Sequence, residues 1–344
     1  MRTKYYKVDL SEPDLSVLAA AADILKQGGL VAFPTETVYG LGANGLDAHA
    51  VAGIFRAKGR PADNPLILHI DSPDKINDLA VSVPGSAQAL IGQYWPGPLT
   101  VIVERRSCVP DAVTGGLNTV AVRLPASLIA RELIRLAGVP VAAPSANISG
   151  RPSPTAAQDV LADMDGKIDA VIDAGPCAIG VESTVVDCTT PVPTLLRPGG
   201  ITYEMLTAVL GEVEVDPALA GSRAVPKSPG MKYTHYAPLA PMFLVEGDRS
   251  IVVREVQQAL AAGKRVGAVV SAETAAGLPP AAITVVYGSH ADAHAIAANL
   301  YTALRSFDNK AVDVIYAEGI AEQGLGLAVM NRMRKAAGYR IIRN

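Results

Sequence analysis

Cysteine, charge and long apolar stretches are all scarce in this sequence. Its three cysteines, Cys108, Cys177 and Cys188, form no CxxC pair, which argues against a disulfide scaffold or a zinc site and favours a reducing compartment. Residues 1–7 lack the apolar core of a secretory signal. No uninterrupted apolar run reaches the roughly 20 residues of a membrane-spanning helix. The sequence therefore predicts a cytoplasmic protein with no membrane span.

Several common signatures of chemistry are also missing. The chain has no Walker A loop, no GxSxG elbow and no kinase signature, so a nucleoside triphosphate would have to bind outside the common phosphate-loop pattern. The histidines show no HExxH pattern and no cysteine partner, which argues against a metal held by side chains. They are His49, His69, His235, His290 and His294. Gly324-Leu-Gly326 lacks the third glycine and the nearby acid of a dinucleotide fingerprint.

What the chain does contain is typical of a well-buried globular enzyme. Its 344 residues are 49% hydrophobic and 18% charged, a composition that excludes a disordered chain and favours two domains. The net charge of -3 argues against a protein that is basic throughout. It leaves room for a local basic cleft, because clusters of charge decide anion binding more than totals do.

The hydrophobic pattern divides the chain into two α/β parts. Residues 1–210 combine short apolar strands with segments of helical periodicity. Residues 211–241 show little periodicity and contain five prolines, which is typical of a linker or a lid. Residues 242–344 alternate strands with helices and predict a small parallel sheet of doubly wound type.

The first polar segment follows the apolar strand expected at residues 30–33. The strand stops at Pro34, and two threonines, a glutamate and a turn containing Gly40 and Gly42 come next. This order predicts a polar loop at the end of a buried strand. Such loops hold ligands in α/β proteins.

Two cations continue this segment, because Lys58 and Arg60 flank a glycine after a helix expected at residues 48–57. The end of a solvated helix would explain an isolated Lys-Gly-Arg, since cations favour that end of the helix dipole. Here the turn residues that follow and the polar loop before them favour an anion site instead. Phosphate is the ligand that such cations and glycines suit best.

A second polar loop follows the strand expected at residues 139–143. It contains Ser145 and Asn147, with Ser149, Arg151 and Ser153 close behind. Side chains of this kind either bond to their own backbone in a turn or donate hydrogen bonds to phosphate oxygens, and the residues alone leave both readings open. A third candidate pairs residues 182–187 with Arg197, although each of these is more often structural when it stands alone.

Together these segments resemble the YrdC-type threonylcarbamoyl-AMP synthases in their longer, two-domain form. The matching stretches are Pro34-Thr-Glu-Thr-Val-Tyr-Gly-Leu41, Lys58-Gly-Arg60-Pro, Asn64-Pro-Leu66, Pro144-Ser-Ala-Asn147-Ile-Ser-Gly, Glu182-Ser-Thr184, Arg197-Pro-Gly199, Ser228-Pro-Gly-Met231 and His235-Tyr236. Their combination in this order is specific. The resemblance implies a YrdC-like catalytic domain with a twisted open sheet at residues 1–210, a linker and active-site lid at 211–241, and a smaller, Rossmann-like doubly wound domain at 242–344.

The resemblance also implies an activity. Members of this family make L-threonylcarbamoyl-AMP from L-threonine, bicarbonate or CO2, and ATP, and they release pyrophosphate. Mg²⁺ is expected on the ATP phosphates and not on protein side chains. The product passes to the tRNA threonylcarbamoyl transferase machinery, which modifies adenosine 37 of tRNA. Weak RNA binding is kept open, and no membrane partner is expected.

Site residues follow from the same resemblance, with Lys58 and Arg60 expected to act in catalysis. ATP would be bound by Lys58, Arg60, Asn64, Thr119, Ser145, Asn147, Ser153, Arg197 and Tyr236. L-Threonine would be bound by Thr37, His69, Arg123, the backbone of Ala143, and Ser183.

Two other functions remain open from the sequence. A nucleic-acid-binding module would present a basic cleft to duplex RNA, which requires many Lys and Arg side chains on one face. The net charge of -3 weighs against this as the main role. A hydrolase that cleaves acyl- or carbamoyl-adenylates would use the same site as a synthase.

Overall fold

The computed structural model describes residues 2–220 and 235–343 of the chain. It comprises two compact units, the first of residues 1–149, 154–178 and 182–232, and the second of residues 150–153, 179–181 and 233–344. None of the described helices is both long enough and apolar enough to cross a membrane. Within the expected linker and lid at 211–241, the candidate lid is residues 228–238, and most of it lies outside the described residues. The predicted domain bounds stay predictions.

A mixed sheet of eleven strands forms the first unit. In spatial order the strands are β1 (Lys4–Lys7), β8 (Ala170–Asp173), β2 (Val31–Pro34), β3 (Tyr39–Asn44), β7 (Val141–Ala142), β4 (Ile67–His69), β6 (Thr119–Arg123), β5 (Leu99–Glu104), β9 (Thr184–Asp187), β10 (Thr194–Arg197) and β11 (Glu214–Val215). Strand β4 runs parallel to β6, and β5 runs parallel to β9. Strand β7 runs antiparallel to both β3 and β4. The centre of the sheet is therefore built from strands that lie far apart in the sequence.

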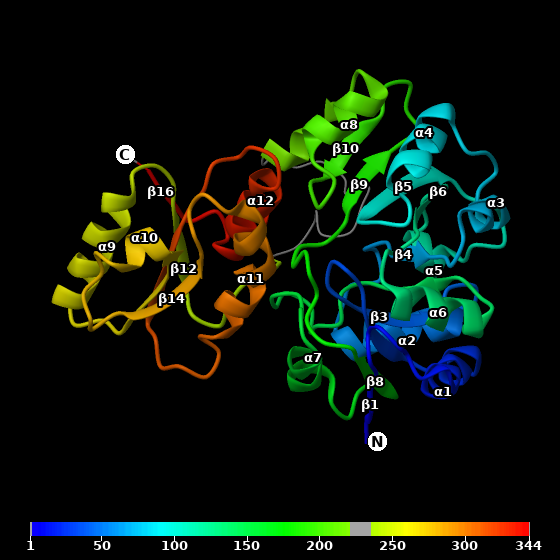
Figure 1. Cartoon of the computed structure of the whole chain (residues 1–344), viewed down its shortest axis with the longest axis horizontal. Coiled ribbons are helices and arrows are strands. Elements are labelled where there is room, and N and C mark those ends of the chain that lie inside the picture. Colours follow the sequence, from blue (N-terminus) through cyan, green and yellow to red (C-terminus); the bar gives the residue numbers. More distant parts are fainter. Residues whose placement is uncertain (1, 221–234, 344) are drawn as a thin grey trace. The chain divides into compact units, whose positions relative to one another are not determined.

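Helices cover this sheet, and polar side chains cap the first turn of several of them. They are α1 (Leu15–Lys26), α2 (Ala48–Lys58), α3 (Ile76–Leu79), α4 (Gly85–Tyr94), α5 (Asp111–Thr114), α6 (Leu128–Ala137), α7 (Ala157–Met164) and α8 (Tyr203–Leu210). Asp47, directly before α2, is the N-cap that its sequence position predicts; it accepts hydrogen bonds from the first turn of α2, and Gly59 ends that helix in the left-handed conformation. Helices α1 and α6 pack side by side (Figure 1).

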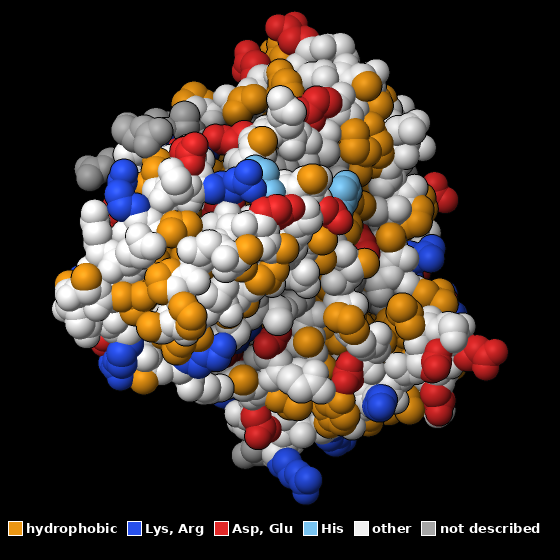
Figure 2. All heavy atoms as spheres, turned by 60° about the vertical axis from the view of Figure 1, so that its left-hand side comes forward, with side chains coloured by type: hydrophobic (Ala, Val, Ile, Leu, Met, Phe, Trp, Pro, Cys, Tyr) orange, Lys and Arg blue, Asp and Glu red, His pale blue; other side chains and the backbone are white. Residues whose placement is uncertain are grey.

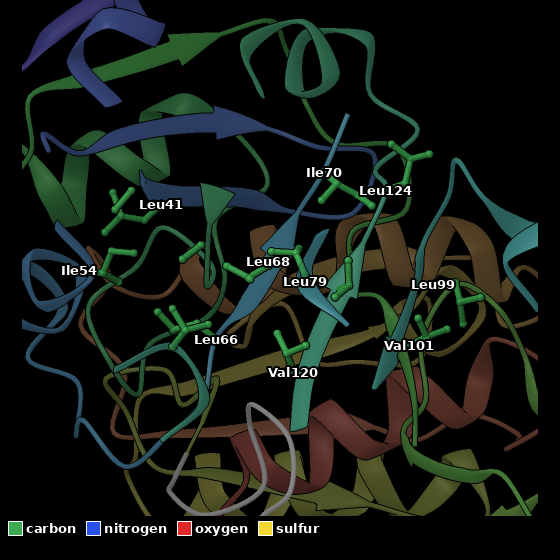
Figure 3. Packing of buried hydrophobic residues seen from close by; sticks show 14 of the residues in the cluster. Leu41, Ile54, Leu66, Leu68, Ile70, Leu79, Leu99, Val101, Val120 and Leu124 are labelled. Atoms are coloured by element: carbon green, nitrogen blue, oxygen red, sulfur yellow. The ribbon is translucent and has the colours of Figure 1, made fainter. Parts of the chain in front are cut away.

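Alternating side chains of the strands fill two hydrophobic clusters. Val31 and Phe33 of β2 belong to the cluster that contains the buried faces of α1 and α6. Ala32, between them, belongs to the other cluster with Leu41 and Leu68, and Figure 3 shows part of that packing. The period of two places successive side chains on opposite faces, so the central strands are buried on both sides.

The predicted turn at Gly40 and Gly42 is wrong. Both glycines lie within β3, which pairs with β2 as an antiparallel hairpin. A Cβ atom on Gly42 would stand 2.8 Å from both Phe33 Cε1 and Val141 Cγ1. The glycine leaves space for the Phe33 ring over the strand, and local sequence does not reveal this long-range contact.

Most other expected elements of the first unit are present, with ends shifted by a few residues. The sequence predicts a helix at residues 85–94 and strands at 99–104 and 170–173, and α4, β5 and β8 have these bounds. Elements that the sequence did not indicate are β1, α3, α5, α7, α8 and β11. Strands β1 and β11 are short and lie at the two edges of the sheet, where few apolar side chains mark them.

The second unit contains a parallel sheet of five strands, which confirms the predicted doubly wound type. The strand order is β14 (Ile283–Gly288), β13 (Val266–Ser271), β15 (Val314–Glu318), β12 (Met242–Val245) and β16 (Ile341–Ile342). The helices are α9 (Arg249–Ala261), α10 (Ala272–Ala275), α11 (Ala293–Arg305) and α12 (Gly326–Ala336). Figure 1 shows α9 on one side of this sheet and α11 and α12 on the other. Helix α10 and strand β16 are further elements that the sequence did not indicate.

The Phe33 contact gives a first testable prediction. Gly42→Ala places a methyl group 2.8 Å from that ring, so we expect the free energy of unfolding to fall by about 1–3 kcal/mol. Gly92→Ala is the matched control, since a Cβ on Gly92 in α4 meets nothing within 4 Å. That variant should be neutral or gain up to about 1 kcal/mol. Denaturant unfolding measures both, and equal stabilities of the two variants would contradict the packing described.

Candidate functional site

Five adjacent strands place candidate residues in one row across the first sheet. His69 on β4 is the register partner of Arg123 on β6, and Arg123 is the partner of Thr100 on β5. The row continues through Val185 on β9 to Arg197 on β10. Residues directly opposite one another in adjacent strands project from the same face. The fold therefore brings three predicted site residues, far apart in sequence, onto one face of the sheet.

The imidazole of His69 is buried and neutral. Only 3% of the residue is exposed, and burial, followed by the nearby charge of Arg123, lowers its pKa to about 3. Its ring packs edge-on against Phe33, with ring centroids 6.3 Å apart. The Nδ1 atom has no hydrogen-bond partner among the described residues. A neutral imidazole can donate to or accept from a hydroxyl, so His69 suits a small polar ligand.

Arg123 lies in an ion pair that sequence reasoning missed. Its Nη2 atom donates to Glu36 Oε1 at 2.6 Å, and both side chains are largely buried. Burial alone would raise the pKa of Glu36, but the charge and hydrogen bond of Arg123, together with backbone N–H groups, hold this pKa below its usual value. The one available signal was that Glu36 is the only carboxylate between Pro34 and Leu41.

Thr37 lies in the loop that joins β2 to β3, and it is fully buried. Its Oγ1 atom is 2.8 Å from Thr35 Oγ1, which itself donates to the carbonyl of Val38 at 2.6 Å. Thr37 must then be the donor to Thr35, which leaves its oxygen able to accept a further hydrogen bond. Ala143 is also buried, and its N–H donates to the carbonyl of Ile67.

Ser183 links two members of the row, Thr100 and Arg197. Its hydroxyl lies 2.8 Å from Thr100 Oγ1 and accepts a hydrogen bond from Arg197 Nη2 at 3.1 Å. Arg197 Nε also donates to the carbonyl of Ser183 at 3.0 Å. Thr100 is fully buried, and its role was not predicted because a threonine inside an apolar strand resembles any β-branched core residue.

Lys58 holds the second polar loop by its backbone. Its ammonium group is 2.5 Å from the carbonyl oxygens of both Ser145 and Asn147, and only 2% of the residue is exposed. Within that loop Ser145 Oγ is 2.5 Å from Asn147 Oδ1. The structure thus brings three predicted ATP residues together, with the lysine ordering the loop that carries the other two.

Arg60 and Asn64 lie together in the turn after α2. Arg60 Nη2 donates to the carbonyl oxygens of Asn64 at 3.3 Å and Pro65 at 3.2 Å. Thr119 lies elsewhere, at the opposite end of β6 from Arg123. It lines a separate cavity of about 850 Å³ with Arg105 and others.

Ser153 and Tyr236 belong to the second unit. Ser153 is fully buried, and Tyr236 has a positive φ of 65°. The Tyr236 ring stacks on Tyr301 with centroids 5.2 Å apart, and the Arg332 guanidinium lies 6.0 Å from its centroid. The proposed roles of Ser153 and Tyr236 in ATP binding stay predictions.

The fold is that of an α/β enzyme, and this row of polar side chains on one face of its mixed sheet is the candidate site for a small polar ligand. The family Sua5_yciO_yrdC, described as telomere recombination, matches residues 23–199. The family described as threonylcarbamoyl-AMP synthase, C-terminal domain, matches residues 201–338.

Known proteins resemble the chain over its whole length. The threonylcarbamoyl-AMP synthase of Pyrococcus abyssi (strain GE5 / Orsay) is 52% identical over 328 residues, which are 94% of this chain and 94% of that protein. The threonylcarbamoyl-AMP synthase of Bacillus subtilis (strain 168) is 49% identical over 351 residues, covering 100% of both. The crystal structure of P. abyssi Sua5 complexed with L-threonine has a TM-score of 0.95 at 49% identity, covering 99% of this chain and 100% of that one. The chain belongs to the threonylcarbamoyl-AMP synthase family, in its two-domain Sua5 form.

The neutral state of His69 gives a second prediction. We expect its ring to show no titration between about pH 5 and 8 in an imidazole NMR spectrum, whereas an ordinary histidine titrates near about 6.5. His69→Gln assigns the resonance. Because the unfolded chain takes up this proton and the folded chain does not, His69 lowers the free energy of unfolding as the pH falls below about 6.5. A titration step near that pH, lost in His69→Gln, would contradict a buried neutral ring.

Proposed function

We propose that this chain makes L-threonylcarbamoyl-AMP from L-threonine, bicarbonate or CO2, and ATP, and releases pyrophosphate. One observation carries the proposal beyond the family assignment. His69 and Arg123 are register partners on adjacent strands, and each offers a polar atom that has no partner among the described residues. The imidazole of His69 suits the hydroxyl of threonine, and the guanidinium of Arg123 suits its carboxylate.

The first reaction step would join the threonine amine to CO2. The neutral amine attacks the carbon, a nitrogen–carbon bond forms, and one amine proton leaves to solvent. Arg123 supports this step because a nearby cation lowers the pKa of an amine. We assign no general base, since orientation alone can supply about 7–11 kcal/mol in favourable cases.

In the second step a carbamate oxygen would attack the α-phosphorus of ATP. The new phosphorus–oxygen bond forms as the bond to the leaving pyrophosphate breaks, and negative charge moves onto that group. Arg60 and Arg197 would stabilise this charge. Lys58 would act as a positive charge at the loop that it orders through the carbonyls of Ser145 and Asn147.

Mg²⁺ is proposed to accompany ATP on its phosphate oxygens, where it would neutralise charge. The described parts of the chain contain no group of three or more His, Cys, Asp or Glu side chains that could hold a metal ion. Phosphate oxygens are ligands that Mg²⁺ favours. The proposed ATP residues, among them Lys58, Arg60 and Arg197, would bind this magnesium–ATP complex.

Choice of threonine over valine follows from the buried polar groups. A site that hydrogen-bonds a substrate hydroxyl can reject the analogue without it by about 10⁴-fold or more. Thr37 and His69 are both buried and each can serve such a hydroxyl.

We further propose a cytoplasmic enzyme whose product is passed to the machinery that modifies adenosine 37 of tRNA. Residues 228–238 remain the proposed lid, because water hydrolyses both carbamate and mixed anhydride.

An RNA-binding module is the less favoured alternative. On the face drawn in Figure 2, Lys and Arg side chains lie singly or in small groups among Asp and Glu. Phosphate-directed RNA binding needs a basic patch. Weak RNA binding beside catalysis remains part of the proposal.

Pyrophosphate release provides the third prediction. Release from ATP should require both L-threonine and bicarbonate, because the carbamate forms before phosphorus is attacked. Each is omitted in turn, and L-valine replaces L-threonine as the matched control. Release that continues without either substrate would indicate an ATP hydrolase, and hydrolysis of added L-threonylcarbamoyl-AMP by water to threonine, CO2 and AMP would indicate the adenylate hydrolase.

A further inference from the structure

A carboxylate lies where the proposed substrate brings another carboxylate. Glu36 stands in the loop between β2 and β3, in the segment that also carries Thr37. Its side chain is 13% exposed. Two negative groups near one another repel, most strongly where water is excluded. A pocket for an amino acid therefore needs a reason to contain this glutamate.

Both carboxylate oxygens of Glu36 are occupied by donors from other elements. Oε1 accepts from Arg123 Nη2 at 2.6 Å, at the end of β6. Oε2 accepts from the backbone N–H of Ala126 at 3.0 Å and of Ser127 at 3.3 Å. Ser127 is the N-cap of α6 and also donates its hydroxyl to the carbonyl of Pro34. Glu36 thus faces Arg123 on one side and the start of α6 on the other.

The guanidinium of Arg123 is held along one edge as a result. Its Nε atom donates to the carbonyl of Gly97 at 3.4 Å, and Nη2 donates to Glu36. Among the described residues Nη1 has no hydrogen-bond partner. Only 3% of Arg123 is exposed. Because the group is planar, fixing Nε and Nη2 also fixes the direction in which Nη1 points.

We propose that Glu36 is a positioning residue for L-threonine, which aims Nη1 of Arg123 at the substrate carboxylate. The inference rests on the proposed function, since it concerns the threonine half of that site. Glu36 compensates the buried charge of Arg123 before substrate arrives. The substrate then meets an oriented donor and does not have to order a mobile arginine itself.

Two variants separate this role from simple packing. Glu36→Gln keeps the shape, but its amide presents an oxygen to only one side, so it cannot accept from both Arg123 and the N–H groups of α6. Glu36→Asp keeps the charge but is one methylene too short to reach both. We expect each variant to raise the KM for L-threonine at least tenfold, while the KM for ATP at saturating threonine changes less than threefold.

The matched control is Glu132→Gln. Glu132 also pairs with an arginine, Arg135, at 2.7 Å, but on the outer side of α6. Its KM values should equal those of the unmodified chain. An unchanged threonine KM in Glu36→Gln would overturn the proposal. A lower threonine KM would also overturn it, because the charge of Glu36 would then oppose the substrate.

A double-mutant cycle shows whether Glu36 acts through Arg123. We expect Glu36→Gln to weaken L-threonine binding at least tenfold in the unmodified chain and less than twofold in Arg123→Lys, as measured by calorimetry at a temperature where thermal unfolding shows all variants folded. Equal effects in both backgrounds would overturn the proposal, because coupled residues are not additive. If pyrophosphate release in the unmodified chain did not need threonine, the proposed function itself would fail, which is a distinct result.

Discussion

The buried ion pair between Glu36 and Arg123 is the interaction on which the candidate threonine pocket depends. Taking two charges out of water costs several kcal/mol per ion unless each finds good hydrogen bonds. Here Arg123 and the N–H groups of Ala126 and Ser127 supply them to the carboxylate. The pair therefore persists only while the β2–β3 loop, the end of β6 and the start of α6 keep their relative places. A shift of any one of these elements therefore changes the hydrogen bonds that it makes with the other two.

The same hairpin connects the two halves of the site. Strand β3 exchanges two backbone hydrogen bonds with the loop that carries Ser145 and Asn147. The N–H of Leu41 donates to the carbonyl of Pro144, and the carbonyl of Tyr39 accepts from the N–H of Ala146. Its preceding loop carries Glu36 and Thr37. One short segment thus anchors both the proposed amino-acid pocket and the proposed nucleotide loop, which is where a carbamate would have to meet the α-phosphorus.

Local chemistry made much of the fold predictable. Asp47 and Gly59 mark the ends of α2, and the strand-like residues that follow the break at Trp95-Pro-Gly-Pro98 predict β5 with its observed bounds. The turn predicted at Gly42 failed because its cause, the Phe33 ring, lies on another strand. Short edge strands such as β1 bury too little to leave a pattern.

The sequence names candidate site residues, which stay predictions, but it does not predict their contacts. The family resemblance named His69 and Arg123, yet their placement as register partners depends on a crossing of strands that no local pattern encodes. Lys58 stays a predicted ATP residue, but the contacts of its ammonium group with two loop carbonyls could not be predicted from the sequence. The contacts of Glu36 could not be predicted, because they join the β2–β3 loop to the end of β6 and the start of α6.

A crystal structure of this chain with bound L-threonine tests the central claim most directly. The account predicts the substrate carboxylate within about 3.2 Å of Arg123 Nη1, the hydroxyl beside His69 Nδ1, and the Glu36–Arg123 pair intact. Threonine bound away from this row, or an Arg123 side chain released from Glu36 to reach the substrate, would contradict it.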